Sequence, residues 1–438
     1  DVELPSTACY GEDLIDALRS GELDMEVLDL SVRRHLQKKF ELGLFENPYV
    51  NEDTVLEVFE TDANRTLAYE IACQSMVLLK NDGLLPLKQT IGKLAVIGPN
   101  ADSARNLMGD YSYTATAELL TALPNPDSVF ASYTMAQASA PTVKMVTVLE
   151  GIREVVSAAT KVDYAHGCEI NSDDESGFDA ALALARSSDG VVLVMGGKSG
   201  LTWDCTTGEF RDATDLGLPG VQEKLINAVL ATGKPVALVL VNGRPAAIPE
   251  IAGKVNAILE AWVPGEEGGR AVAAALFGNI NPGGKLPLSI PRSVGQIPVF
   301  YNHKPSGMHS NIYGDYYDEP AAPLFCFGHG LSYTTFEYSE LKVNPSDVNP
   351  GDIVDISAEI RNSGTIAGDE VVQLYLHDEF ASFPRPVKEL KGFKRIQLQP
   401  GEKRQITFHL DTRQLAFYDE NLEMILEPGQ FSVMIGSS

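Results

Sequence analysis

The chain has 438 residues, of which 44% are hydrophobic and 21% are charged, and this length favours two or three domains over one core. Its 34 basic and 60 acidic residues give a net charge of −26, which argues against nucleic acid and anionic lipid as partners. No apolar run approaches the ~20 residues that cross a membrane, so we expect no membrane-spanning segment.

The first 45 residues begin as the tail of a strand and continue as two helical patterns. The second pattern starts at Asp24 and repeats an apolar residue at every fourth position, at Leu28, Val32, Leu36 and Phe40. A free-standing domain would not begin with half a strand and two helices. We therefore interpret residues 1–45 as the closing βα unit of a larger domain.

Residues 46–92 are predicted to be a linker. It contains one helix over about residues 62–75, a short apolar run at 77–79 and the turn Asn81-Asp-Gly83. The predicted linker contains no periodic segment longer than this helix.

From about residue 93 to residue 300, strand-like and helix-like segments alternate. Continuous apolar runs, typical of strands buried on both faces, occur at residues 94–97, 191–195, 236–241 and 257–259. Amphipathic helices are predicted at residues 147–158, 176–186 and 220–231. The alternation predicts an α/β/α sandwich with a parallel sheet. Residues 108–145 are polar and irregular, and we expect a long surface loop there.

The sequence pattern changes twice in the last part of the chain. Residues 301–340 are rich in Tyr, Gly and Pro without a clear period, and we predict a connecting loop. Residues 341–438 contain about seven short alternating strands, separated by turns such as Asn349-Pro-Gly351 and Gln399-Pro-Gly401. This pattern predicts a β-sandwich of about 100 residues.

Several short motifs occur in a fixed order along nearly the whole chain. They include Val96-Ile-Gly-Pro-Asn100, Asn242-Gly-Arg-Pro245, Trp262-Val-Pro-Gly-Glu-Glu-Gly-Gly269, Phe325-Cys-Phe-Gly-His-Gly-Leu-Ser-Tyr333 and Arg385-Pro-Val-Lys-Glu-Leu-Lys-Gly-Phe393. In this order, the sequence resembles glycoside hydrolase family 3, in its β-glucosidase and β-xylosidase branch. The resemblance implies the end of a (β/α)8 barrel, then an α/β/α sandwich, then a fibronectin type III-like domain.

The resemblance also implies that most of the barrel is absent from this sequence. The family carries its nucleophilic aspartate on the barrel, in a Ser-Asp-Trp-like motif, and no such motif occurs here. Asp1 matches the acidic residue downstream of that motif. We therefore expect an N-terminal barrel polypeptide as a partner, beside a β-glycoside or oligosaccharide substrate, while a homodimer of the full enzyme is left open.

One loop carries the strongest catalytic candidate. It follows the apolar run 191–195 and precedes the helix pattern 220–231, and chemistry in open α/β sheets gathers where strands end. From spacing alone, Glu209 in this loop is an ordinary carboxylate. The family resemblance aligns it with a Gly-Glu-x-Arg-like segment and implies the role of general acid/base.

The implied activity is that of an exo-acting, retaining β-glucosidase that hydrolyses terminal non-reducing β-D-glucosyl residues without a cofactor. Retention requires two carboxyl groups roughly 5–5.5 Å apart, one as the nucleophile and one as the acid/base. A β-xylosidase of the same family is the alternative. A non-catalytic carbohydrate-binding or assembly module is the alternative from another class of protein.

Other side chains are candidates for substrate contacts. Trp203 suits stacking on a sugar ring, because the C–H groups of a sugar face pack well on aromatic rings, or else it anchors its loop. Asp204 is either a ligand for sugar hydroxyls or a turn residue. Tyr313 and Tyr316 lie on the predicted connecting loop, where they reach a substrate site or pack on the surface. Arg211 is expected to point toward Asp212.

A rival carboxylate pair and other kinds of site are set aside. Glu266 and Glu267 open a predicted helix, where negative charge suits the helix N-terminus, so we interpret them as structural. The glycines around them lack the spacing of a phosphate-binding loop. Five scattered cysteines and seven histidines show no metal-ligand spacing, so no metal is expected.

Overall fold

The computed structural model describes residues 2–3, 9–122, 143–305, 307, 312 and 314–437. Their contacts divide the chain into two units, Asp1–Asn64 and Arg65–Ser438. We describe each unit by itself. Among the described residues, no helix is both long and apolar enough to cross a membrane.

The first unit is helical, as its periodicity predicts. It contains α1 (Glu12–Ser20), α2 (Met25–Glu41), the short helices η1 (Glu52–Thr54) and α3 (Val55–Val58), and the start of α4 (Asp62–Ser75). Asp24 caps α2 by accepting a hydrogen bond from the Glu26 N–H at 3.1 Å. The predicted strand tail covers residues 1–5, of which 1, 4 and 5 lie outside the described residues.

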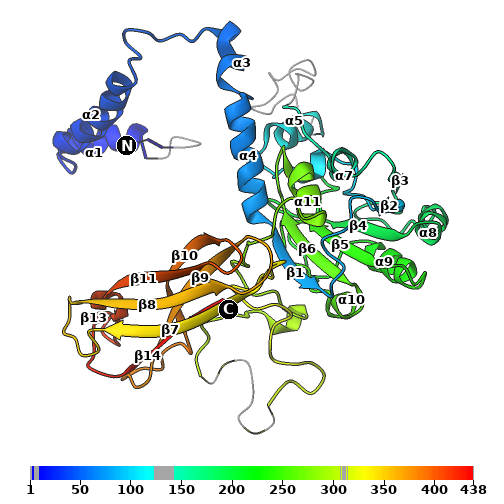
Figure 1. The fold of residues 1–438 in the computed structure, drawn as a ribbon. Coiled ribbons are helices and arrows are strands. Elements are labelled where there is room, and N and C mark those ends of the chain that lie inside the picture. Colours follow the sequence, from blue (N-terminus) through cyan, green and yellow to red (C-terminus); the bar gives the residue numbers. More distant parts are fainter. Residues whose placement is uncertain are drawn as a thin grey trace. The chain divides into compact units, whose positions relative to one another are not determined.

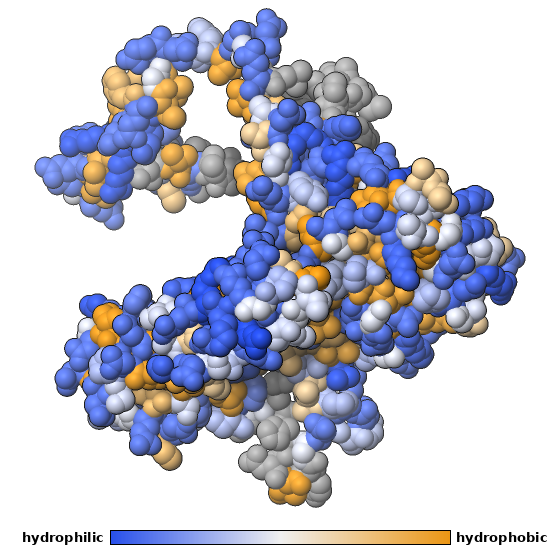
Figure 2. Space-filling model, in the orientation of Figure 1, coloured by the Kyte–Doolittle hydropathy of each residue, from blue (hydrophilic) through white to orange (hydrophobic). Residues whose placement is uncertain are grey.

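The two long helices of this unit bury no residue among those described. Apolar side chains at the predicted four-residue spacing are exposed, with Leu36 at 40% and Phe40 at 62%. Figure 2 shows apolar residues at the surface of this unit, interleaved with polar ones. Since a helix gains most of its stability by packing an apolar face, these faces require a partner surface.

The second unit begins with a six-stranded sheet in the order β1-β6-β5-β4-β2-β3 (Figure 1). The strands are β1 (Val77–Asn81), β2 (Lys93–Ile97), β3 (Lys161–Ala165), β4 (Gly190–Gly196), β5 (Val236–Val241) and β6 (Ala257–Trp262). All neighbours are parallel except β1, which pairs antiparallel with β6. In the central register, Leu193 of β4 lies opposite Ile97 of β2 and Leu238 of β5.

Helices cover both faces of this sheet (Figure 1). They are α5 (Tyr113–Ala122), α7 (Val148–Val155), α8 (Phe178–Arg186), α9 (Gln222–Leu230), α10 (Pro249–Lys254) and α11 (Gly268–Leu276), with the short η2 (Arg105–Leu107) and η3 (Val294–Gln296). One apolar cluster packs α7 and α11 on the sheet, and a second packs α8, α9 and α10 on it. The predicted α/β/α sandwich is therefore confirmed.

Three segments differ from the sequence expectations. The predicted linker 46–92 contains β1, which is a strand of the sheet. Strand β3 was missed because, at the sheet edge, it lacks a continuous apolar run. Part of the predicted loop 108–145 forms α5, whereas residues 123–142 lie outside the described residues.

The C-terminal part is a β-sandwich, as predicted. One sheet has the order β11-β8-β7 and the other the order β10-β9-β14, and Ile356, Leu374, Leu398 and Phe408 fill the core between them. The strands are β7 (Phe336–Asn344), β8 (Ile353–Asn362), β9 (Gly368–Asp378), β10 (Glu389–Leu398), β11 (Lys403–Asp411) and β14 (Phe431–Gly436). The helix η4 (Thr412–Leu415) and the pair β12 (Phe417–Tyr418) and β13 (Met424–Ile425) complete the sandwich.

Candidate active site

The loop with the catalytic candidate leaves the carboxyl end of β4, a central strand of the sheet. Its two sides form a stem, in which the Gly200 N–H donates to the Thr207 carbonyl at 2.9 Å and the Thr206 N–H donates to the Lys198 carbonyl at 2.9 Å. Gly208 follows with φ 127, and a Cβ there would lie 2.3 Å from the Gly200 carbonyl oxygen. The stem and this glycine set the turn that presents Glu209.

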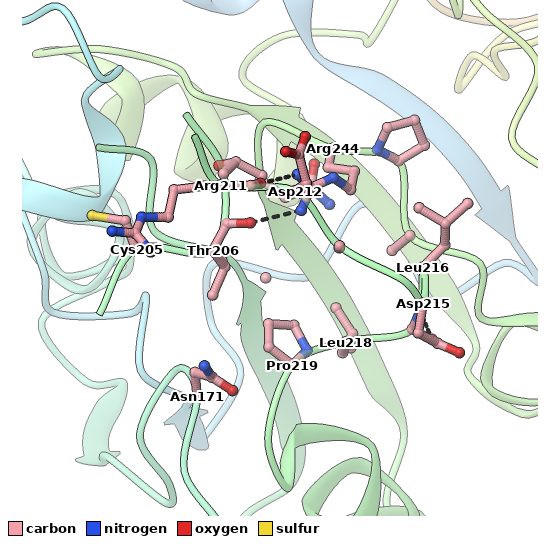
Figure 3. Close-up of a pocket in the computed structure, with 18 of the residues that line it drawn as sticks. Asn171, Cys205, Thr206, Arg211, Asp212, Asp215, Leu216, Leu218, Pro219 and Arg244 are labelled. Atoms are coloured by element: carbon pink, nitrogen blue, oxygen red, sulfur yellow. Dashed lines mark hydrogen bonds between the residues drawn. The ribbon is translucent and has the colours of Figure 1, made fainter. Parts of the chain in front are cut away.

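Arg244 fixes the backbone on both sides of that turn. Its guanidinium comes from the connection after β5 and donates to the carbonyl of Thr206 at 2.6 Å and to the carbonyl of Arg211 at 2.5 Å (Figure 3). Glu209 and Phe210 lie between these two carbonyls in the sequence. The Arg244 guanidinium therefore holds both ends of the segment that carries Glu209.

Glu209 itself is exposed and has a phenol as its partner. The Tyr111 hydroxyl donates to Oε2 of Glu209 at 2.6 Å. The hydrogen bond to Glu209, with burial and the charge of Glu209 as smaller causes, raises the pKa of Tyr111. Because Tyr111 belongs to a segment 98 residues earlier in the chain, the fold creates this contact.

Two large apolar side chains of the loop that carries Glu209 are exposed at the surface. Trp203 is 83% exposed, and Phe210 is 85% exposed with a positive φ of 62. A non-glycine residue in the left-handed region is uncommon and indicates a constrained turn. Exposed aromatic rings beside a carboxylate are the surface that a sugar ring packs on.

Arg211 does not point where we expected. Its guanidinium lies over the Trp203 ring, 4.8 Å from the ring centroid, and the side chain extends away from Asp212 (Figure 3). No ion pair joins it to Glu209 or Asp212 within the part of the chain that the structure describes. Cation–π attraction to the indole accounts for this placement.

Asp204 is bound within its own loop. Oδ2 accepts a hydrogen bond from Lys198 Nζ at 2.6 Å, and Oδ1 accepts one from the Thr202 hydroxyl at 2.7 Å. Partial burial opposes ionisation, but the ammonium of Lys198 and the hydroxyl of Thr202 lower the pKa of Asp204. Lys198 also donates to Glu118 at 2.5 Å, so a small charge cluster braces the loop.

A hollow of about 500 Å³ lies on the inner side of this loop (Figure 3). Trp203, Phe210 and Arg211 line it, together with Asn242, which follows β5, and Asn171 from the connection after β3. Both polar side-chain atoms of Asn242 and Nε of Arg211 are buried without a hydrogen-bond partner. The hollow therefore has a mixed polar and apolar lining and lies at the sheet edge where α/β proteins bind ligands.

The structure brings together some of the predicted site residues and not others. Trp203 lines the hollow, whereas Glu209, Asp204 and Tyr316 are outside its lining. Tyr316 is 47% exposed on the segment between the two domains. Tyr313 lies outside the described residues. Among the described residues, no three potential metal ligands gather at one point.

The rival carboxylates have a different environment. Glu267 is only 2% exposed and pairs with Arg65 and with Arg270, the latter at 2.9 Å. Glu266 lies 3.9 Å from Arg65. Glu267 precedes α11 but makes no side-chain cap bond, so the arginines, rather than the helix N–H groups, hold these carboxylates.

Sequence reasoning missed two residues of the site. Arg244 belongs to the Asn-Gly-Arg-Pro motif that supported the resemblance, and this motif was the signal from which a role for Arg244 in the loop could have been predicted. Tyr111 lies in a segment predicted to be an irregular loop, and no sequence spacing connects it to Glu209.

Comparison with known proteins identifies relatives over almost the whole chain. The Glycosyl hydrolase family 3 C-terminal domain matches residues 76–333, and the Fibronectin type III-like domain matches residues 370–438. A β-xylosidase of Formosa agariphila is 40% identical over 427 residues, which are 97% of this chain and 55% of the relative. A periplasmic β-glucosidase of Salmonella typhimurium is 38% identical over 98% of this chain and 56% of its own length.

A solved structure agrees with these relatives. The β-glucosidase of Listeria innocua in complex with glucose superposes with a TM-score of 0.82 at 36% identity, covering 99% of this chain and 56% of that protein. The chain thus spans about half the length of the proteins that it matches.

Proposed function

The chain belongs to glycosyl hydrolase family 3, and from this premise we propose that it supplies the general acid/base of a retaining, exo-acting β-glucosidase. The substrate is a terminal non-reducing β-D-glucosyl residue, and no cofactor takes part. Glu209 carries this proposal, because it lies at the tip of a braced loop beside exposed aromatic rings. A β-xylosidase is the second candidate, since the Formosa agariphila relative has that name at 40% identity.

In this mechanism, Glu209 first donates a proton to the leaving group and later accepts a proton from water. The nucleophilic aspartate of the barrel attacks the anomeric carbon while Glu209 protonates the departing glycosidic oxygen, so the alcohol leaves neutral. The Glu209 carboxylate then takes a proton from water. The water oxygen attacks the anomeric carbon, the bond to the aspartate breaks, and glucose leaves with its original configuration.

Two observations support a substrate and a partner of this kind. The β-glucosidase of Listeria innocua has been solved in complex with glucose and, as a mutant, in complex with laminaribiose. The first unit has apolar helix faces that need a covering surface, which suits residues 1–45 as the last βα unit of a barrel, with the part of residues 46–92 before β1 as its connection to the sandwich. We propose the barrel polypeptide as that surface.

The test uses this chain assembled with the family's barrel and an aryl β-glucoside as substrate. We expect Glu209→Ala to lower kcat/KM by about 10²–10⁴-fold for a poor leaving group, which needs the proton. With a good leaving group the loss is small, and azide, which needs no base, restores turnover of the glycosyl-enzyme. The isolated chain is expected to be inactive.

Glu250→Ala is the matched control, because its side chain is 84% exposed on α10 and lies outside the loop. It should leave the rate unchanged. If Glu209→Ala also leaves the rate unchanged for the poor leaving group, the acid/base assignment is wrong. The alternative of a non-catalytic carbohydrate-binding or assembly module then gains support.

A further inference from the structure

Oε2 of Glu209 accepts a hydrogen bond from the Tyr111 hydroxyl at 2.6 Å, and no other side chain among the described residues forms a hydrogen bond or ion pair with the Glu209 carboxyl group. The second oxygen, Oε1, therefore remains available to other groups. Such a division between one occupied and one free oxygen matters for a proton donor, because a carboxylic acid has its proton on one oxygen only.

A second contact joins the segments that carry these two residues. Glu118 on α5 accepts from Arg105 Nε at 2.9 Å and from Lys198 Nζ at 2.5 Å. Arg105 and Glu118 flank Tyr111 in the sequence, and Lys198 begins the stem of the Glu209 loop. The Lys198 side chain is only 10% exposed, so this link is shielded from water more than a surface ion pair is.

The turn around Tyr111 is itself ordered by local hydrogen bonds. The Ser112 hydroxyl donates to the Gly109 carbonyl at 2.7 Å, and the Ser112 N–H donates to the same carbonyl at 3.2 Å. Tyr111 is thus presented from a fixed turn, as Glu209 is from its stem. The turn of Tyr111 and the stem of the Glu209 loop are each ordered by their own hydrogen bonds. They are linked by the part-buried Glu118–Lys198 pair and meet at the Tyr111–Glu209 hydrogen bond.

We propose that Tyr111 is the positioning residue of Glu209 and directs the catalytic proton to Oε1. The inference rests on the proposed function of Glu209. As a donor, the phenol occupies Oε2 whether Glu209 is neutral or ionised, so the acidic proton is held on Oε1 and faces the leaving oxygen. After that proton is transferred, Oε1 is the oxygen that accepts the proton of water, and Tyr111 keeps its own proton throughout.

The first test is Tyr111→Phe in the chain assembled with the barrel. We expect kcat/KM to fall by about 10-fold for a glucoside with a poor leaving group, the loss expected for one hydrogen bond to a charged group. For a dinitrophenyl glucoside, which leaves without protonation, the change should stay within about twofold. A general disturbance of the loop would lower both rates, whereas misplacement of the proton lowers only the first.

Tyr164→Phe is the matched control. It removes a phenol that contacts His166 in the same domain, at 3.1 Å, and it should leave both substrates unaffected. Equal losses for both leaving groups in Tyr111→Phe, or no loss with either, would overturn the positioning role.

A second test needs neither the barrel nor turnover. Since the contact to Glu209 raises the pKa of Tyr111, Glu209→Gln should lower that pKa toward the ordinary value of 10.0. Phenolate absorbance of the isolated chain, compared with that of Tyr111→Phe, identifies the Tyr111 contribution. An unchanged Tyr111 titration in Glu209→Gln would overturn the contact.

The two proposals fail in different ways. If Glu209→Gln keeps kcat/KM with the poor leaving group, the acid/base role fails and the positioning role falls with it. If Glu209→Gln loses this activity while Tyr111→Phe retains it, only the positioning role fails.

Discussion

Two loops at the same edge of the α/β sheet carry glutamates that differ in burial and in the kind of partner they have. The loop after β4 leaves Glu209 exposed, with a neutral phenol as its partner. The loop after β6 buries Glu267 to 2% exposure, with Arg65 and Arg270 as partners. Both loops follow parallel strands, so position at the sheet edge does not distinguish a proposed catalytic carboxylate from a structural one.

The kind of partner does distinguish them. Glu267 is held by ion pairs with two arginines at a nearly fully buried position. A phenol can donate to a neutral carboxyl group as well as to a carboxylate, so it orients the group without excluding either state. A residue that must be acid and then base in one cycle is better served by the second arrangement.

The largest effect that would test this contrast is on folding stability. We expect Glu267→Gln to lower the free energy of unfolding by about 3–5 kcal/mol, because the carboxylate that pairs with both Arg65 and Arg270 at a nearly fully buried position loses its charge. Urea unfolding of the isolated chain measures this loss. Glu209→Gln, the matched change in the exposed loop, should stay within about 0.5 kcal/mol of the wild type.

Similar losses in the two variants would remove the contrast between the loops. Equal stability of wild type and Glu267→Gln would show that the arginines contribute nothing through Glu267.

A third glutamate, at the end of β6, gives a pH-dependent effect of intermediate size. Glu260 is fully buried, and burial raises its pKa to about 8, although the Trp262 N–H donates to it at 3.0 Å. Between about pH 4.5 and pH 8, the unfolded chain releases this proton and the folded chain keeps it. Stability is therefore expected to fall as pH rises through this window.

Glu260→Gln cannot ionise and should abolish that dependence. We expect the stability of the variant relative to wild type to improve by roughly 3 kcal/mol between pH 5 and pH 8, as measured by urea unfolding at both values. If wild type and variant follow parallel curves with pH, Glu260 does not titrate as its burial indicates.

The same sheet shows which parts of the fold could be predicted from the sequence. Strands β4 and β5, and residues 257–259 of β6, are continuous apolar runs because both of their faces are buried, and such runs are visible without a structure. The edge strand β3 has intermediate burial along most of its length and carries no such run. Strand β1 was visible as an apolar segment, but its antiparallel pairing with β6 depends on residues about 180 positions away.

The site divides in a similar way. Glu209 could be named because the family resemblance aligns it with a catalytic motif. Its partners could not, since Tyr111 is 98 residues away and Arg244 reaches the carbonyls of Thr206 and Arg211 across 38 and 33 residues. Local spacing contains no information on contacts that only the sheet order creates.

The smallest expected effect concerns Asp204, which belongs to the same loop as Glu209 but has an ionic partner. Its side chain is 65% exposed, so the ion pair with Lys198 is screened by solvent and should contribute under about 1 kcal/mol. Lys198 also keeps Glu118 as a partner when Asp204 is changed. Asp204→Asn should therefore destabilise the chain far less than Glu267→Gln does.

The direction with pH follows from the lowered pKa of Asp204, whose burial is outweighed by its bonds to Lys198 and Thr202. Its contribution is present above the ordinary pKa of 3.8 and is lost as pH falls through the lower folded value. The difference between wild type and Asp204→Asn should then vanish in acid and be constant near neutrality. A loss of several kcal/mol would instead mean that the loop after β4 is as rigidly held by charge as the loop after β6, and that the presentation of Glu209 depends on Asp204 as much as on Tyr111.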